Sequence, residues 1–524
     1  MRILFIALFF FYQPCGAVHA TTLPEPVSAA LKHAHIPPSS VAIVVQEAHE
    51  GQPIISLNAE RPMNPASTMK LLTTFAALET LGPAYRWKTA AYLNGKLENG
   101  VLQGDLVFKG YGDPKLTVEQ FWMWLRELRQ RGLREIRGDI VLDRSFFEDT
   151  HQDPAEFDND PTRAYNVGTS ALLLNFNALH LHLIPNGHAT TALLEPELAG
   201  YSLLNRITTS TQLRCGGDDA YKAHLDGRNI VLEGSIPAGC GEADDYFSLL
   251  PHDEYFFAVF NALWQELGGT LQGKMRIGLA PANQSPFAQY VSPPLSEVIR
   301  DINKFSNNTM ARQLFLSLGA AEVMKELPTT VNSAEVLTVE NNRTRNNALS
   351  AQAPDDASFS AQQEGGDVAD AELPIASPPQ ANTQPVNILR STAAIQQWLK
   401  TQQLQFPELV LENGAGLSRK ERISAQHLAG LLRRATNSPF HAELEASLPI
   451  LGMDGTMKKR LKDSEIAGYA HLKTGSLEGV KSLAGYVKAH SGKQWIVVFI
   501  INHPNAALGQ HAQDALIEWL QKWH

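Results

Sequence analysis

The most regular stretch of the chain is residues 471–502, HLKTGSLEGVKSLAGYVKAHSGKQWIVVFIIN. Its β-branched and aromatic residues fall into three runs, which are separated by short turns that contain glycine. This pattern predicts strands over 471–476, 481–489 and 494–502, which pair as consecutive hairpins. A last helix is expected over 508–523. The end of the chain therefore predicts antiparallel strands with a helix packed against them.

Two segments near the start of the chain extend this sheet. Residues 41–47 and 53–57 are further apolar runs, and a polar turn joins them. A helix is expected over 67–81, because its apolar residues recur at helical spacing and Gly-Pro ends it. We therefore predict an α+β domain, an antiparallel five-stranded sheet flanked by helices, formed by residues 21–85 and 281–524.

The middle of the chain has a different pattern. Over 86–280, short apolar runs alternate with turns, and one helix is expected over 117–132. We interpret 86–280 as a strand-rich insert of one or two subdomains. A helical pattern returns over 295–319, with a break near Ser306.

Residues 328–387 have eight acidic residues, two basic residues and no tryptophan or tyrosine. Such a segment buries too little apolar area to offset its ordering entropy. We expect a disordered acidic loop within the α+β domain, with an interaction tail as the alternative.

The first twenty residues predict export. Arg2 precedes an apolar run over 3–12, and Val18-His19-Ala20 is a small-residue cleavage site, so 1–20 is predicted to be a signal peptide. A buried strand or an uncleaved anchor is the alternative, although a spanning helix needs ~20 apolar residues. We expect a periplasmic protein with no membrane span after cleavage.

Two cysteines remain in the mature chain, Cys215 and Cys240. An even number of cysteines in an exported protein favours a disulfide between them, and two unpaired thiols are the alternative. The net charge of −10 gives no field for phosphates, which argues against nucleic acid as a partner. No set of residues with metal-ligand spacing occurs, because the His33/His35 and His180/His182 pairs have no third ligand nearby.

The helix over 67–81 begins with Ser67-Thr68-Met69-Lys70. Positions i and i+3 share a helix face, so the Lys70 amine can lie beside the Ser67 hydroxyl. A desolvated lysine can take the proton of a nucleophilic serine. Alone, the pattern is also that of a helix-capping serine followed by a surface lysine.

Two further motifs contain hydroxyl, amide and ammonium groups. Ser306-Asn307-Asn308 falls at the predicted break between helices, where a hydroxyl can relay a proton and an amide can bind a substrate amide. Lys473-Thr474-Gly475-Ser476 falls on the first strand of the terminal hairpins. Lys473 offers a positive charge for a carboxylate, and Gly475 allows close approach of a substrate backbone. Each motif alone also fits ordinary helix-end or strand-end residues.

In this order, the three motifs match the set of serine β-lactamases and penicillin-binding proteins. The chain resembles the class C low-molecular-mass penicillin-binding proteins, which are D-alanyl-D-alanine carboxypeptidase/endopeptidases of the dacB type in peptidase family S13. Residues 110–114, 412–419 and 448–456 resemble further blocks of that family, and the resemblance covers almost the whole mature chain. A large insert between the first two motifs is also typical of the family.

The resemblance implies a serine β-lactamase/DD-peptidase-like fold and a penicillin-sensitive serine DD-peptidase. Its substrates would be peptidoglycan stem peptides, cut at D-alanyl-D-alanine bonds or at D-alanyl-diamino-acid crosslinks. β-Lactam antibiotics would act as covalent inhibitors, and no metal or organic cofactor would be needed.

The resemblance also implies a role for each motif residue. Ser67 would attack the carbonyl, Lys70 would accept its proton, and Ser306 would pass a proton to the leaving amine. Asn308 would bind the substrate backbone and orient Lys70. The terminal carboxylate would be held by Lys473, Thr474 and Ser476, and the oxyanion by the backbone amides of Ser67 and Ser476.

Two other functions fit parts of the sequence. A serine β-lactamase shares the chemistry, but the large insert argues against it. A non-catalytic wall-binding scaffold would suit the acidic segment, but the complete set of motif residues argues against that function.

Overall fold

The computed structural model describes residues 23–49, 52–149, 152–186, 189–211, 221–326 and 384–523. The predicted signal peptide, Cys215 and most of the acidic segment lie outside these residues. Of Cys240 only the backbone is described, so the predicted disulfide stays a prediction.

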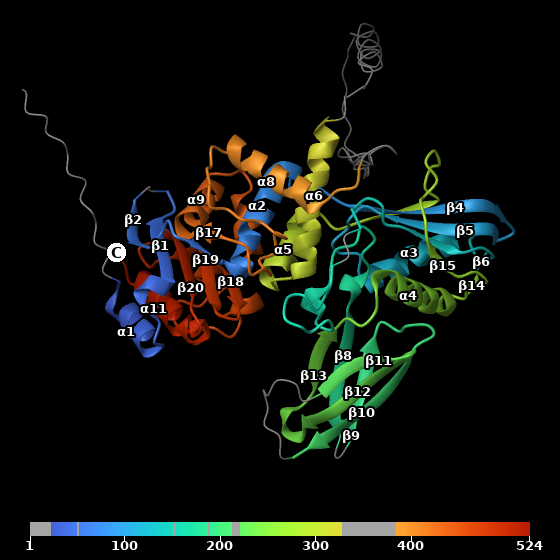
Figure 1. Ribbon diagram of the computed structural model, residues 1–524, viewed down its shortest axis with the longest axis horizontal. Helices are drawn as coiled ribbons and strands as arrows, with labels where there is room; N and C mark the ends of the chain where they lie inside the picture. The colour runs from blue at the N-terminus through green and yellow to red at the C-terminus, as the bar shows by residue number, and fades with distance from the viewer. Residues whose placement is uncertain are drawn as a thin grey trace, which may run out of the picture.

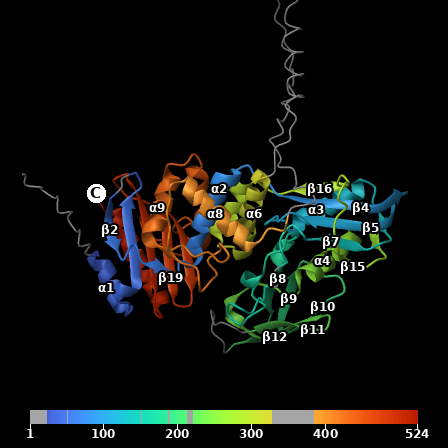
Figure 2. The same cartoon turned by 45° about the horizontal axis from the view of Figure 1, so that its top comes forward.

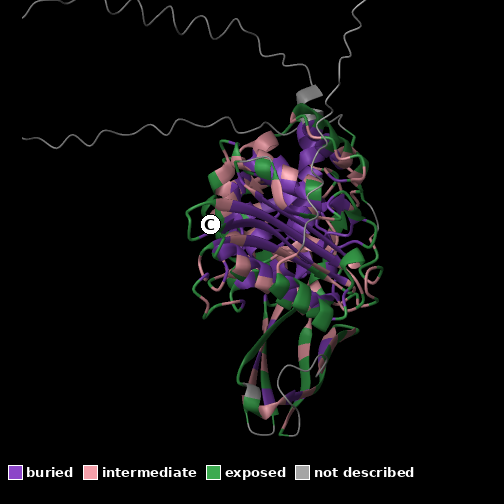
Figure 3. Ribbon diagram, turned by 90° about the vertical axis from the view of Figure 1, so that its left-hand side faces the viewer, coloured by how far each residue is buried: buried purple, intermediate pink, exposed green. Residues whose placement is uncertain are grey.

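A five-stranded antiparallel sheet forms the centre of one lobe (Figure 1). Its strand order is β18 (Ala470–Leu477), β19 (Val480–Lys488), β20 (Gln494–Asn502), β1 (Val41–Glu47) and β2 (Pro53–Leu57). The predicted sheet is confirmed, and β20 begins and ends where its sequence pattern does. Seven of the nine β20 residues are buried, so this strand is covered on both faces, and Figure 3 shows mostly buried strands in the middle of the lobe.

The two faces of this sheet carry separate hydrophobic cores, because successive side chains of a strand point to opposite faces. Ile43, Phe499 and their face of the sheet pack against α1 (Glu25–His33) and α11 (Gln510–Gln521). Val44 and Val498 face the other core, which contains the other helices of this lobe (Figure 1). These helices are α2 (Lys70–Leu81), α5 (Leu295–Lys304), α6 (Asn308–Glu326), α8 (Ile388–Thr401), α9 (Ala425–Thr436) and α10 (His441–Ser447).

One helix prediction differs in detail from the structure, and another is confirmed. The helix expected over 67–81 starts as a 3-10 turn over Ala66–Met69, and only then becomes α2. The pattern over 295–319 is two helices, α5 and α6, with the break at Phe305 to Asn307 as expected. In addition, β3 (Pro62–Met63) pairs with β17 (Ile423–Ser424).

The first and last parts of the insert together form a seven-stranded sheet that packs against α3 (Val118–Gln130) and α4 (His252–Glu266) (Figure 2). Phe108 lies at the centre of its core, with ring centroids of four other aromatic residues 5.4–5.9 Å away. The strands are β4 (Lys88–Glu98), β5 (Val101–Gly110), β6 (Glu135–Ile136), β7 (Ile140–Asp143), β14 (Thr270–Leu271), β15 (Met275–Ile277) and β16 (Ala288–Val291). Because β16 pairs with β4, this sheet continues past residue 280, where the insert was predicted to end.

A second sheet of the insert projects from the first (Figure 1). Its strand order is β11 (Tyr221–Asp226), β12 (Asn229–Pro237), β10 (Ser202–Ser210), β9 (Ala189–Glu195), β8 (Leu179–Asn186) and β13 (Ala243–Phe247). Among the described residues, no helix is long and apolar enough to cross a membrane.

The insert contacts the first lobe where the acidic segment ends. Val386 exchanges backbone hydrogen bonds with the insert, donating to Phe146 O at 3.0 Å and accepting from Glu148 N at 2.8 Å. Its side chain is buried against Phe147 and Leu316. Residues 384–387, which were predicted to belong to the disordered loop, are therefore ordered, because this apolar side chain has a packing site.

Replacing Phe108 by alanine is expected to loosen the insert. Removing a buried aromatic ring costs about 3–5 kcal/mol, so hydrogen exchange at the β4 and β5 amides should become faster. Met123→Ala on α3 is the control, because that side chain is 56% exposed. Equal exchange rates in the two variants would contradict this account of the core.

Candidate active site

Ser67 lies in the 3-10 turn that precedes α2, and the residues before it are fixed to the sheet. Asn64 exchanges two hydrogen bonds with Asn502 at the end of β20, at 2.8 and 3.0 Å. The Asn64 Oδ1 atom then accepts from the backbone N–H of Ala66 at 2.9 Å. Ala66 adopts a left-handed backbone, φ +46°. The position of Ser67 is thus set by the sheet as well as by its own helix.

Two glycines make room for this turn. A Cβ atom on Gly475 would lie 2.2 Å from Ser482 Oγ and 2.8 Å from Pro65 O. A Cβ atom on Gly416 would lie 2.0 Å from Ala66 O. The close approach predicted at Gly475 therefore involves the protein's own backbone before Ser67. Any larger residue at either position displaces the turn.

The Lys70 amine is completely buried and lies among three oxygens. Its Nζ atom is 3.1 Å from Ser67 Oγ and 2.7 Å from Asn308 Oδ1, and it donates to Ala415 O. Asn308 Oδ1 and the Ala415 carbonyl can only accept, so they take the two hydrogens of a neutral amine. The lone pair is left for the Ser67 hydroxyl.

Burial is the main reason that the pKa of Lys70 lies well below its ordinary value, and the charge of Lys473 lowers it further. A neutral amine at 3.1 Å can accept a hydroxyl proton. This pair can therefore generate a nucleophilic oxygen.

A second buried amine, that of Lys473 on β18, lies beside Ser306. Lys473 Nζ donates to Ser306 Oγ and to Thr474 O, both at 2.9 Å. Burial lowers the pKa of Lys473 to about 7. Ser306 itself has a left-handed backbone, φ +58°, at the break between α5 and α6.

These groups meet at an open cleft of about 700 Å³. Ser67, Ser306, Asn308, Thr474 and Ser476 line it, and the two lysines lie buried behind them. The structure therefore brings together all seven residues that the sequence motifs proposed for the site.

Sequence reasoning missed other side chains that line the cleft. Phe157, Asp158 and Tyr165 come from the insert, and the guanidinium of Arg419 lies 4.9 Å from the Phe157 ring centroid. No motif marks the three insert residues. Arg419 and Thr456 belong to stretches noted for resemblance only, and the Thr456 hydroxyl lies 2.7 Å from that of Thr474.

Histidines of the insert lie apart from this cleft. His180 Nε2 and His182 Nδ1 contact the same Asp244 oxygen at 2.8 and 2.9 Å. In the part of the chain that the structure describes, no group of three or more histidine, cysteine or acidic residues is placed to hold a metal ion.

Comparisons with known proteins agree with this geometry. The profile of the D-Ala-D-Ala carboxypeptidase 3 (S13) family matches residues 23–342 and 375–523. D-alanyl-D-alanine carboxypeptidase DacB of Haemophilus influenzae is 23% identical over 468 residues, which is 88% of this chain and 85% of that protein. D-alanyl-D-alanine carboxypeptidase of Actinomadura sp. (strain R39) is 24% identical over 519 residues, 95% of this chain and 84% of that protein.

The fold has a counterpart among solved structures. The crystal structure of penicillin-binding protein 4 (dacB) from Haemophilus influenzae superposes with a TM-score of 0.68 at 23% identity. The match covers 95% of this chain and 99% of that one. The predicted fold class is thereby confirmed.

Gly475→Ala is expected to slow any reaction at Ser67 by about 10²-fold, because a misplacement of about 1 Å can have that effect. Gly430→Ala on α9 is the control, since nothing lies within 4 Å of its added Cβ. The measurement is the rate of covalent labelling of each folded variant by an acylating reagent. A rate equal to that of the parent in Gly475→Ala would contradict the packing argument.

Proposed function

The chain belongs to the D-Ala-D-Ala carboxypeptidase 3 (S13) family, and on that premise we propose that it works through a Ser67 acyl-enzyme. The observation that carries the proposal is the 3.1 Å contact between Ser67 Oγ and the buried amine of Lys70. A serine hydroxyl needs a base to become nucleophilic, and a lysine whose pKa is lowered by burial is such a base.

In the acylation step, Ser67 Oγ attacks the carbonyl carbon of the penultimate D-alanine, and its proton moves to Lys70 Nζ. Backbone N–H groups of Ser67 and Ser476 would hold the oxyanion, at ~3 kcal/mol per donor. Asn308 holds Lys70 in place through its 2.7 Å contact, and it binds the substrate backbone.

Collapse of the tetrahedral intermediate breaks the peptide bond, and the leaving amine needs a proton. Ser306 relays that proton: it gives its own hydroxyl proton to the amine and takes up the one that Lys70 received from Ser67, and the Lys473 amine, 2.9 Å from its hydroxyl, favours the transfer. Lys473, Thr474 and Ser476 hold the terminal carboxylate of the substrate. Water then hydrolyses the acyl-enzyme and restores Ser67.

The substrates proposed for this cleft are peptidoglycan stem peptides. Hydrolysis of a terminal D-alanyl-D-alanine bond is the carboxypeptidase reaction, and hydrolysis of a D-alanyl-diamino-acid crosslink is the endopeptidase reaction. β-Lactam antibiotics would acylate Ser67 in place of the substrate. The Haemophilus influenzae relative has also been solved as a complex with a β-lactam. That structure superposes on this chain with a TM-score of 0.65.

Export follows from the substrate, because peptidoglycan lies outside the cytoplasm. We propose that residues 1–20 are a cleaved signal peptide, that the enzyme is periplasmic, and that Cys215 and Cys240 form a disulfide there. We also propose a peptidase domain and an insert as predicted, 21–85 with 281–524 and 86–280, with the insert extended to residue 291 so that it includes β16. The basis is the sequence pattern together with the family membership.

Benzylpenicillin is expected to add its mass to the parent chain and to leave Ser67→Ala unmodified. The measurement is intact mass over time for both proteins. A lasting adduct fits a DD-peptidase, because its acyl-enzyme with penicillin deacylates slowly. Rapid loss of the adduct with steady antibiotic turnover would indicate a β-lactamase, and no adduct on the folded parent would indicate a scaffold.

The preference for a free terminal carboxylate should depend on pH. Below pH 7 the Lys473 amine is charged, and above its pKa of about 7 that charge is lost. We therefore expect kcat/KM for a peptide ending in D-Ala-D-Ala to fall as the pH rises through about 7, relative to the same peptide with an amidated terminus. A ratio between the two peptides that does not change with pH would contradict the role of Lys473.

A further inference from the structure

A fully buried acid, Glu421, acts on Lys70 by its charge and has no part in the mechanism above. Its Oε1 atom accepts three backbone hydrogen bonds, from Glu412 N at 3.1 Å and from Asn413 N and Gly414 N at 2.9 Å each. One carboxylate oxygen thus holds three successive N–H groups. The turn over 412–414 is folded around this side chain.

The same turn supplies an oxygen to Lys70. Ala415, the next residue, accepts from Lys70 Nζ through its carbonyl, and its N–H donates to Asn413 Oδ1 at 2.9 Å. Thr73, on the helix of Lys70, donates to Gly414 O at 2.6 Å. Glu421 therefore reaches Lys70 through the turn that it holds.

Glu421 also acts on Lys70 by its charge. Lys473 and Arg312 lower the pKa of Lys70, whereas Glu421 raises it. Burial raises the pKa of Glu421 itself, and the three N–H groups and Lys70 oppose that shift. Its second oxygen, Oε2, is buried and has no hydrogen-bond partner among the described residues. Of the two carboxylate oxygens, only Oε1 thus accepts hydrogen bonds from the described residues.

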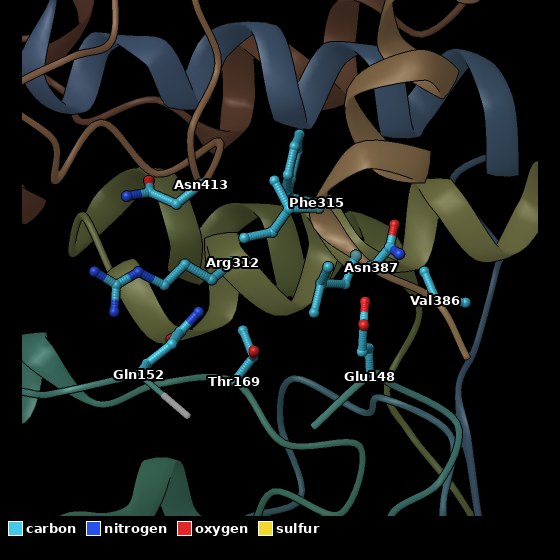
Figure 4. A pocket seen from close by; sticks show the side chains of 10 residues that line it. Glu148, Gln152, Thr169, Arg312, Phe315, Val386, Asn387 and Asn413 are labelled. Carbon is cyan, nitrogen blue, oxygen red and sulfur yellow. The ribbon is translucent and has the colours of Figure 1, made fainter. Parts of the chain in front are cut away.

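Arg312 is a half-buried cation one helical turn after Asn308 on α6. Its guanidinium donates to Val167 O at 2.9 Å, while its Nε atom has no partner in the described part of the chain. Burial lowers the pKa of Arg312 to about 10, and Glu421 raises it. Figure 4 shows Arg312 beside a cavity of about 20 Å³, with Asn413 on one side and insert residues such as Gln152 on the other.

The proton transfer from Ser67 to Lys70 changes the charge of a buried side chain. When Lys70 takes the proton of Ser67, a second cation forms in a water-free site that already holds Lys473. A buried charge is strongly unfavourable unless an opposite charge offsets it. Glu421 is the acid that acts on Lys70 there.

We propose that Glu421 is a positioning residue for the acylation step: it holds the 412–415 turn against Lys70 and offsets the proton that Lys70 receives. Arg312 acts in the opposite sense at the same amine, because its charge lowers the pKa of Lys70. The inference rests on the proposed function, in which Lys70 is the base for Ser67. It adds to that function that Glu421 supplies the negative charge that balances protonated Lys70.

Glu421→Gln separates charge from shape, because the amide keeps an oxygen for the turn and loses the negative charge. Without that charge, protonated Lys70 is less stable. We expect the midpoint of the rise of benzylpenicillin acylation rate with pH to move to lower pH. The limiting rate should fall by at least about tenfold, because a weaker base supplies less of the roughly 10²–10⁴-fold effect of general base catalysis.

Three further variants make the result specific. Glu421→Asp keeps the charge, so its midpoint should stay near that of the parent even if the rate falls. Arg312→Gln removes a cation, so its midpoint should move to higher pH. Glu445→Gln is the matched control, because Glu445 does not line the cleft and instead accepts a hydrogen bond from Gln494 at 2.7 Å. The midpoint of this variant should not move.

A purely structural role would lower the rate at every pH and leave the midpoint unmoved in Glu421→Gln, which would overturn the proposal. Should that variant fail to fold, Glu421→Met takes its place, since it also removes the charge at similar volume, and an unmoved midpoint there would overturn the proposal instead. Ser67→Ala keeps the two proposals apart. If Ser67→Ala is still acylated, the proposed function is wrong. If Ser67→Ala is not acylated and the midpoints do not move, only the proposed role of Glu421 is wrong.

Discussion

Two lysine amines held out of water are the constraint on which the architecture of this enzyme depends. Lys70 and Lys473 are both fully buried, although a lysine is almost never buried without partners. Each amine contacts oxygens of the protein, and each lies beside a serine of the cleft, Lys70 at 3.1 Å from Ser67 Oγ and Lys473 at 2.9 Å from Ser306 Oγ. Burial makes an amine a base near neutral pH, so excluding water from these two side chains is the condition for the chemistry.

Several remote parts of the chain are needed to meet that condition. The sheet carries Lys473 and fixes the turn before Ser67 through Asn502, and α6 contributes Asn308. The turn that ends in Ala415 closes the remaining side of Lys70. The insert interrupts this lobe between α2 and α5. It can do so without harm because β4 and β16 pair with each other and so bring its two ends together.

The sheet and the motif residues could be predicted because their signals are local. β20 is apolar along nearly its whole length, which indicates a central strand covered on both faces, and the spacing of Ser67 and Lys70 places them on one helix face. The 3-10 turn at Ser67 could not be predicted from propensity, because it is set by packing against Gly475 and Gly416. Side chains such as Asp158 reach the cleft only through the tertiary fold, and no local pattern marks them.

Glu421 shows the limit of sequence reasoning most directly. It stands in a run of charged residues, Arg419 to Arg422, which on its own indicates a solvated surface, yet its side chain is fully buried. Replacing buried ion pairs by apolar residues of similar volume is often neutral or stabilising. A fully buried acid such as Glu421 is therefore a poor device for stability alone. Its effect on Lys70, the amine that gains and loses a proton in the proposed mechanism, gives it a physical reason, since a charge of fixed sign is needed where the charge of a neighbour changes.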